Sequence, residues 1–100
     1  MKNDGWVRWS KWESGGMTQF GQMPLREVAG HLRRFAEKAK EVLDKTGADH
    51  VVYGMKQYDA DGELEHIKFY LEPMGDEEFQ SDLATLKGVT IYALHKGTAE

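Results

Sequence analysis

The stretch HVVYGMKQYDADGELEHIKFYLE, at positions 50–72, decides the fold because it has the pattern of a β-hairpin. Its two arms, 50–58 and 63–72, are rich in the β-branched and aromatic residues that favour strands. The segment between the arms contains Asp61-Gly62, and glycine supplies the positive φ that tight hairpin turns require. We therefore expect two neighbouring antiparallel strands over these positions.

The register of this hairpin decides which side chains share a face of the sheet. A two-residue Asp61-Gly62 turn would pair Gly54 with Phe69, whereas a three-residue loop ending in Gly62 would pair Tyr53 with Phe69. A shift by one residue moves every side chain of a strand to the opposite face. The three-residue loop makes one face fully apolar, so we expect that register.

Two helices and a further strand flank the hairpin. Apolar residues recur at spacings of three and four over 25–46, which predicts a long amphipathic helix that begins after Pro24. A shorter helix is predicted over 76–87, with acidic residues in its first turn and a lysine at its end. Positions 89–95 alternate as a last strand.

The N-terminal quarter contains a short strand, predicted over 17–22, and a tryptophan-rich segment before it. Trp6, Trp9 and Trp12 recur every third residue. They would lie along one side of a short helix, whereas on a strand Trp9 would oppose the other two. Tryptophan and valine favour strands, so we prefer the strand and keep the short helix as the alternative.

From Met17 onward the predicted order of elements is βαββαβ, which resembles the ferredoxin-like plan. That plan implies an antiparallel sheet of four strands with both helices on one face. We therefore predict a single α+β domain over 1–100. Its core would span 17–96, and residues 1–16 would form a tryptophan-rich extension of that core.

The composition excludes several classes of protein. The chain of 100 residues has a net charge of −4 and no cysteine, which removes disulfides, thiolate zinc sites and a cysteine nucleophile. The acidic balance argues against a nucleic-acid partner, because phosphate binding rests on clustered lysine and arginine. There is no signal-peptide pattern and no apolar run near the ~20 residues that span a bilayer, so no membrane partner is expected. The lack of cysteine suits a reducing compartment, and we predict a cytoplasmic protein.

The histidines are the residues that most invite a catalytic or metal-binding interpretation. In the predicted sheet no two of the four histidines lie close enough to share an ion, so we expect no metal and no cofactor. His66 is the single candidate for acid or base catalysis, because Lys68 and Tyr70 are expected beside it and a neighbouring ammonium lowers a histidine pKa. No other catalytic set converges, which favours a protein that is not an enzyme.

The chosen register leaves one face of the sheet aromatic and uncovered by helices. The side chains expected on that face are Val52, Lys56, Tyr58, His66, Lys68, Tyr70, Glu72, Thr90, Tyr92 and Leu94. A face this apolar requires a cover, such as the tryptophan segment, a second copy of the chain, another protein or a ligand. The predicted binding residues are Trp6, Trp9, Trp12, Tyr58, His66, Lys68, Tyr70 and Tyr92.

These observations predict a small non-catalytic protein-interaction module of the adaptor, inhibitor or immunity type. Its partner would be another protein or a second copy of the chain, held through the aromatic face and the tryptophan-rich N-terminus. The alternative is a cofactor-independent dimeric α+β-barrel enzyme or small-molecule-binding protein. In that case a small apolar ligand would occupy a pocket on the same face.

Overall fold

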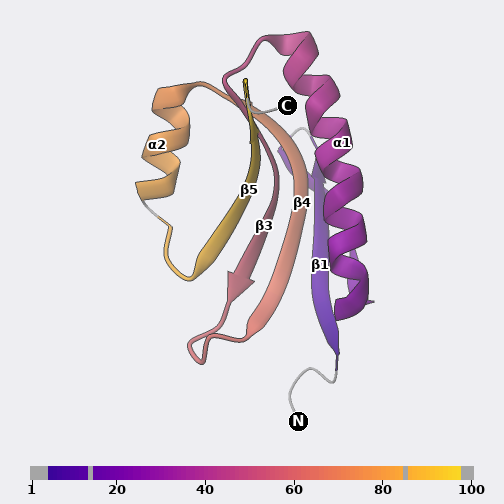
Figure 1. Cartoon of the computed structure of the whole chain (residues 1–100). Helices are drawn as coiled ribbons and strands as arrows, with labels where there is room; N and C mark the ends of the chain where they lie inside the picture. The colour runs from indigo at the N-terminus through magenta and orange to yellow at the C-terminus, as the bar shows by residue number, and fades with distance from the viewer. Residues whose placement is uncertain (1–4, 14, 85, 98–100) are drawn as a thin grey trace.

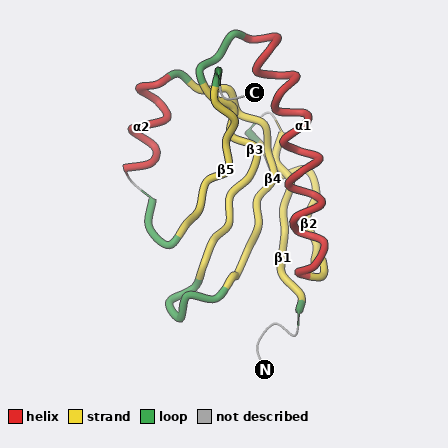
Figure 2. The backbone as a smooth tube through the Cα atoms, in the orientation of Figure 1, coloured by secondary structure: helices red, strands yellow, loops and turns green. Residues whose placement is uncertain are grey.

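The computed structural model describes residues 5–13, 15–84 and 86–97, and within them it contains a five-stranded sheet and two α-helices (Figures 1 and 2). The α+β class predicted from the sequence is confirmed. Neither helix in these residues is both long and apolar enough to cross a membrane. The elements in chain order are β1 (Trp6–Glu13), β2 (Gly16–Pro24), the 3-10 turn η1 (Leu25–Glu27), α1 (Val28–Thr46), β3 (His50–Tyr58), β4 (Leu64–Met74), α2 (Asp76–Ala84) and β5 (Val89–His95).

The order of strands across the sheet is β2-β1-β4-β3-β5. The β1–β4 pair is parallel and the other pairs are antiparallel, so the sheet is mixed. The predicted all-antiparallel, ferredoxin-like sheet is therefore wrong. The tryptophan segment does form a strand, as preferred, but it lies inside the sheet rather than beside it, and β2 is an edge strand.

The central place of β1 follows from its side chains. Val7 and Ser10 point to opposite faces of the strand, and both are buried. A strand that buries residues on both faces needs a neighbouring strand along each edge. Here β2 and β4 supply the two neighbours (Figure 2).

The two helices lie on opposite faces of the sheet, which corrects the prediction that they share one face (Figure 1). Leu32 of α1 packs directly over Gly54 of β3. The ring of Phe79 from α2 stacks on His50 of the same strand, with centroids 4.0 Å apart. β3 explains this arrangement, because Val51 and Val52 are adjacent, point to opposite faces and are both buried.

The hairpin turn matches the prediction, but the register beyond it does not. Asp59 donates its backbone N–H to the carbonyl of Glu63, and Gly62 has a φ of 82°, as in a three-residue loop that ends in Gly62. An irregularity next to Tyr58 then shifts the register by one residue. Gly54 consequently lies opposite Phe69, which is the pairing that the rejected two-residue turn would have given.

Packing under α1 explains the shifted register. A Cβ atom placed on Gly54 would lie 2.7 Å from Cδ2 of Leu32, so only glycine fits beneath that leucine without displacement. The shift places Lys56 and Tyr92 on the α1 face, where both line a hollow beside the helix, and it moves Met55 to the other face. The prediction that Lys56, Tyr92 and Leu94 point away from the helices is therefore wrong.

The core lies between α1 and the sheet. Phe69 is its largest buried side chain and stacks on Phe35 of α1, with ring centroids 5.1 Å apart. α1 ends at Thr46 and is capped by Gly47, which has a φ of 71° and donates its N–H to the carbonyl of Leu43. The buried residues of this cluster are Val7, Met23, Val28, Leu32, Ile67 and Phe69.

Candidate functional site on the sheet face opposite α1

The candidate site is the sheet face opposite α1, which we call the open face. α2 lies over β3 and β5 on this side, where Phe79 and Leu83 line a hollow with Val52 and Ile91. β1, β2 and the first half of β4 lie beyond α2. Strand pairing and alternation place the following side chains on that part of the open face: Trp6, Arg8, Ser10, Trp12, Met17, Phe20, Met55, His66, Lys68 and Tyr70.

Large apolar side chains are exposed on this face. Among the described residues, those with the largest exposed apolar side chains are Trp6, Met17, Phe20 and Leu83. The first three belong to the β1–β2 hairpin, and the fourth belongs to α2. Phe20 is 73% exposed, which is unusual for a phenylalanine in the middle of a strand. The α1 face shows no comparable residue in the described part of the chain.

A partly buried hydrogen-bond network on this face joins β1 to β4. The indole Nε1–H of Trp12 donates to Ser10 Oγ at 2.9 Å, and Ser10 Oγ lies 2.8 Å from His66 Nε2. An indole can only donate, so the arrangement that uses every donor has the Ser10 hydroxyl donating to His66 Nε2. In that arrangement His66 is neutral, with its hydrogen on Nδ1.

The surroundings of His66 favour this neutral state. Burial lowers its pKa most, and the charges of Arg8 and Lys68 lower it further. Glu65 acts in the opposite direction, and it also forms an exposed ion pair with Arg8 at 3.6 Å. From the sequence we expected the neighbouring ammonium to lower the pKa of His66, and the structure adds that burial is the larger cause.

The Ser10–His66 pair has the spacing of a nucleophile and its general base, but its setting differs from that of a catalytic pair. Ser10 is only 1% exposed, so a substrate has no access to its hydroxyl. The indole of Trp12 also occupies the hydroxyl oxygen. The pair therefore forms a hydrogen bond that links two parallel strands, β1 and β4.

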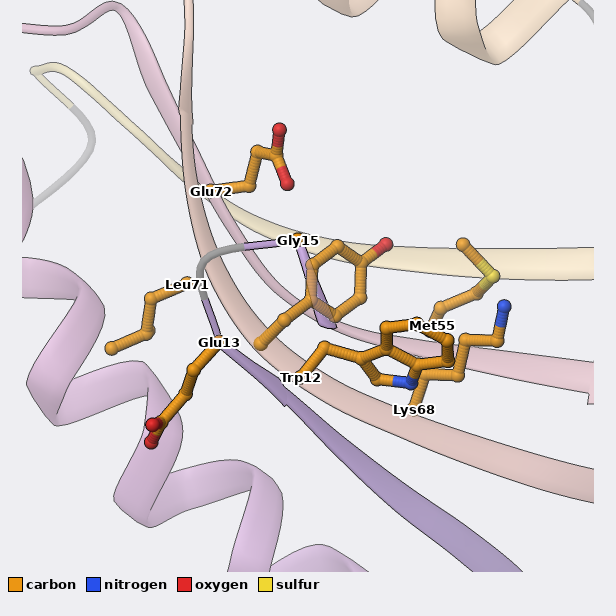
Figure 3. A pocket seen from close by; sticks show the side chains of 8 residues that line it. Trp12, Glu13, Gly15, Met55, Lys68, Leu71 and Glu72 are labelled. Atoms are coloured by element: carbon orange, nitrogen blue, oxygen red, sulfur yellow. The ribbon is translucent and has the colours of Figure 1, made fainter. Parts of the chain in front are cut away.

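Two adjacent hollows shape the open face. The first has a volume of about 230 Å³ (Figure 3). In that view Trp12, Met55 and Lys68 extend to one side of the strands, whereas Leu71 points to the other side. The second hollow, about 260 Å³, lies beneath α2. Its lining shares two residues with the first hollow, Met55 and Tyr70.

Tyr70, which lines both hollows, and Lys68, which lines the first, bring polar groups to this surface. Tyr70 is partly buried, and burial together with the nearby charges of Glu72 and Asp82 raises its pKa to about 12. The ammonium of Lys68 lies 5.2 Å from the centre of the Trp12 ring, as in a cation–π contact. At the first hollow the surface thus combines the aromatic area of Trp12 and Tyr70 with the positive charge of Lys68.

The structure brings together half of the binding residues that the sequence predicted. Trp12, His66, Lys68 and Tyr70 meet on the open face, and Trp6 lies on the same face at the start of β1. The remaining predicted residues, Trp9, Tyr58 and Tyr92, lie elsewhere.

Each of these three has a different place in the fold. Trp9 packs edge-on against Phe69 in the core, because it alternates with Ser10 along β1. Tyr92 packs against the same core from β5. Tyr58 lies at the end of β3, where its backbone N–H donates to the carbonyl of Gly88.

The structure also overturns the expectation that no two histidines lie close together. His50 and His95 pair across β3 and β5, and their Nε2 atoms are 2.9 Å apart. The expectation failed because it placed β3 and β5 at opposite edges of the sheet. Among the described residues no group of three or more His, Cys, Asp or Glu side chains could hold a metal ion.

Sequence reasoning missed three residues of the open face: Ser10, Phe20 and Met55. The alternation Trp6, Arg8, Ser10, Trp12 placed Ser10 on the same face as two tryptophans, which was the available indication for it. Phe20 stands in a strand without a single charged residue, which is unusual for an exposed edge. No sequence feature pointed to Met55 as a residue of the open face, because only the shifted register places it there.

Comparison of the chain with protein-family models, with curated protein sequences and with solved structures gave no match.

Proposed function

We propose that this chain is a non-catalytic protein-interaction module that binds its partner through the open face over β1, β2 and β4. The observation that carries the proposal is the gathering of exposed large apolar side chains on this one face. Exposed apolar patches on a small protein mark interaction surfaces, because leaving them in water is unfavourable. Phe20, with 73% of its surface exposed, is the clearest member of the patch.

The shape of the face supports a protein partner. Protein interfaces derive most of their affinity from a few aromatic or apolar anchors that enter well-packed pockets. The two hollows beside Met55 and Tyr70, about 230 and 260 Å³, suit single large side chains. Lys68, Glu13 and Glu72 at the first hollow would form the polar rim that surrounds such anchors.

The edge of the sheet offers a second means of attachment. β2 is an edge strand, and the sequence Gly16–Pro24 carries no charge. Natural edge strands usually carry charged residues or other devices that prevent pairing with another chain. An uncharged edge beside an apolar face favours a partner that adds a strand to β2 and places side chains on the open face. That partner is either another protein or a second copy of this chain.

The buried setting of Ser10 supports a non-catalytic role. The Ser10–His66 pair, which has nucleophile-to-base spacing, is closed to a substrate. An acid or base role for His66 stays a prediction, as does the cytoplasmic location expected from the lack of cysteine.

The test combines a measured mass with site-directed crosslinking. Light scattering on the purified chain distinguishes a monomer from a dimer. A photo-crosslinking phenylalanine analogue at position 20 should crosslink the partner, or a second copy if the chain is dimeric. The same analogue at position 34, an exposed site on α1, is the matched control.

A single substitution then checks specificity. Phe20→Ser should abolish the association without changing the thermal midpoint, because the side chain makes little contact with its own fold. Arg34→Ser is the control. Equal crosslinking at both positions, or an association that Phe20→Ser leaves unchanged, would contradict the proposal.

A second candidate function is the binding of a small apolar ligand in the hollow lined by Trp12, Met55, Lys68 and Tyr70 (Figure 3). The favourable observation is that an indole, a phenol and an ammonium converge on one hollow. Its volume of about 230 Å³ is below the ~300–1,000 Å³ usual for ligand pockets, so the ligand would be a fragment or would need a second copy to complete the pocket. Such a ligand should quench tryptophan fluorescence, and Trp12→Phe should remove that quenching.

A further inference from the structure

Two histidines meet at the end of the sheet that lies farthest from the turn between β3 and β4. His50 begins β3, His95 ends β5, and the two residues are directly opposite each other in the antiparallel pair. Their Nε2 atoms are 2.9 Å apart. The pair lies beside Asp76 at the N-terminus of α2 and is separate from the Ser10–His66 hydrogen bond, which joins β1 to β4.

The ring of His50 is held in a fixed position. It is only 3% exposed and lies parallel to the ring of Phe79, with centroids 4.0 Å apart and an interplanar angle of 7°. His95, an exposed residue, stands perpendicular to it at 88°. The centroids of the two histidine rings are 4.2 Å apart, closer than two rings aligned end to end across a 2.9 Å contact could come. The two rings are therefore not aligned end to end, and the 2.9 Å contact joins them side-on.

The other nitrogen of His50 faces a carboxylate. Its Nδ1 lies 3.6 Å from Oδ1 of Asp76 and makes no hydrogen bond among the described residues. A carboxylate in this position favours a hydrogen on Nδ1, which leaves a lone pair on Nε2. The same carboxylate–imidazole arrangement orients many histidines that bind metal ions.

We propose that His50 and His95 bind one divalent late transition-metal ion through their Nε2 atoms, with water at the remaining positions. An ion ~2.0–2.1 Å from each nitrogen would see two nitrogens 2.9 Å apart at roughly 90°. That angle fits adjacent positions of a square-planar or tetragonal ion, the geometry of Cu²⁺ and Ni²⁺. With two imidazoles and no third ligand among the residues that the structure describes, Cu²⁺ should bind most tightly, followed by Ni²⁺ and Zn²⁺.

The competing explanation for the contact is a hydrogen bond between the two imidazoles, and the two explanations differ in measurable ways. Titration of the full chain with CuCl₂ should show one ion per chain. Its electron paramagnetic resonance spectrum should carry the splitting of two coordinating nitrogens. Added NiCl₂ should raise the thermal midpoint, because an ion that binds only the folded state stabilises it.

The chain supplies its own matched controls, since it has four histidines, of which His50 and His95 contact each other. His95→Gln and His50→Gln should each lower the affinity for Cu²⁺ at least about tenfold, and His31→Gln and His66→Gln should leave it unchanged. His95 is exposed, so its variant should keep the fold even if the His50 variant does not. The proposal is overturned if the wild-type chain binds Cu²⁺ no more tightly than free imidazole does. It is also overturned if His95→Gln binds as tightly as His31→Gln.

Discussion

The two faces of the sheet differ in how completely they are covered. On one face α1 buries Val28, Leu32 and Ala39 against the strands over its 19 residues. On the open face α2 has 9 residues, and none of those described is fully buried. The first face therefore supplies most of the stability of the fold, and the second keeps apolar area that a partner can cover. The same kind of side chain should matter in different ways on the two faces.

A pair of matched substitutions should show the largest contrast. Phe69 is 2% exposed beneath α1, and Phe20 is 73% exposed on the open face. Phe69→Ala should lower the free energy of unfolding by about 3–5 kcal/mol, because it leaves a cavity in the core. Phe20→Ala should change it by less than about 0.5 kcal/mol. Urea unfolding followed by circular dichroism measures both, and equal losses would show that the open face is part of the core.

A second pair of substitutions compares Gly54, which lies beneath Leu32 of α1, with Gly30, which has open space around it. Gly54→Ala should destabilise the fold by about 1–3 kcal/mol, because its Cβ would meet Leu32 at 2.7 Å. Gly30 lies inside α1 with no atom within 4 Å of an added Cβ, so Gly30→Ala should stabilise the fold by about 0.5–1 kcal/mol. Thermal midpoints that move in the same direction for both variants would contradict the packing of α1 on β3.

Removing the hydrogen bonds that Ser10 makes with Trp12 and His66 should have a smaller effect on stability. Ser10→Ala leaves the Trp12 indole and His66 Nε2 without their shared partner, which should cost about 1–2 kcal/mol of unfolding free energy. Ser81→Ala, at an exposed position of α2, is the control. The Nε1–H resonance of Trp12 should also shift upfield in the Ser10 variant. An unchanged resonance would mean that the indole does not donate to Ser10.

The smallest effect concerns acid. Because the pKa of His66 is lowered in the folded state, the unfolded chain binds the extra proton first as the pH falls through about 6.5. The contribution of His66 to stability is therefore present above that pH, and it declines toward the folded pKa. His66→Gln lacks this titration, so urea midpoints at pH 7.5 and 5.5 should differ less in the variant than in the wild-type chain.

Local features of the fold could be predicted from the sequence, and non-local ones could not. The apolar spacing that predicted a helix over 25–46 is intrinsic to the segment, and the structure has η1 followed by α1 there. The turn at Gly62 was also predicted correctly, because its backbone conformation depends on few residues. The irregularity beside Tyr58 could not be predicted, since the pairing beyond it fits the packing of Gly54 beneath Leu32, a residue distant in sequence.

The candidate site shows the same division. His66, Lys68 and Tyr70 alternate with Ile67 and Phe69 along β4, so they share a face whatever strand lies opposite. Their prediction survived the error in register for this reason.

Strands that are apolar on both sides were harder to place. Tyr92 and Leu94 alternate on β5 with Ile91 and Ala93, which are equally apolar, so the pattern could not choose a face. The His50–His95 pair depended on strand order, which no local pattern contains.

The parallel pairing of β1 with β4 has a consequence for how the chain folds. The β1–β2 and β3–β4 hairpins each join neighbouring segments and can form early. The contact between them joins Arg8 to His66 and Lys11 to Phe69, so a long loop that contains α1 must close first. Until it closes, β4 presents an unpaired edge to any other chain in solution. Refolding yield should therefore fall with protein concentration, and separately added residues 5–24 should compete for that edge.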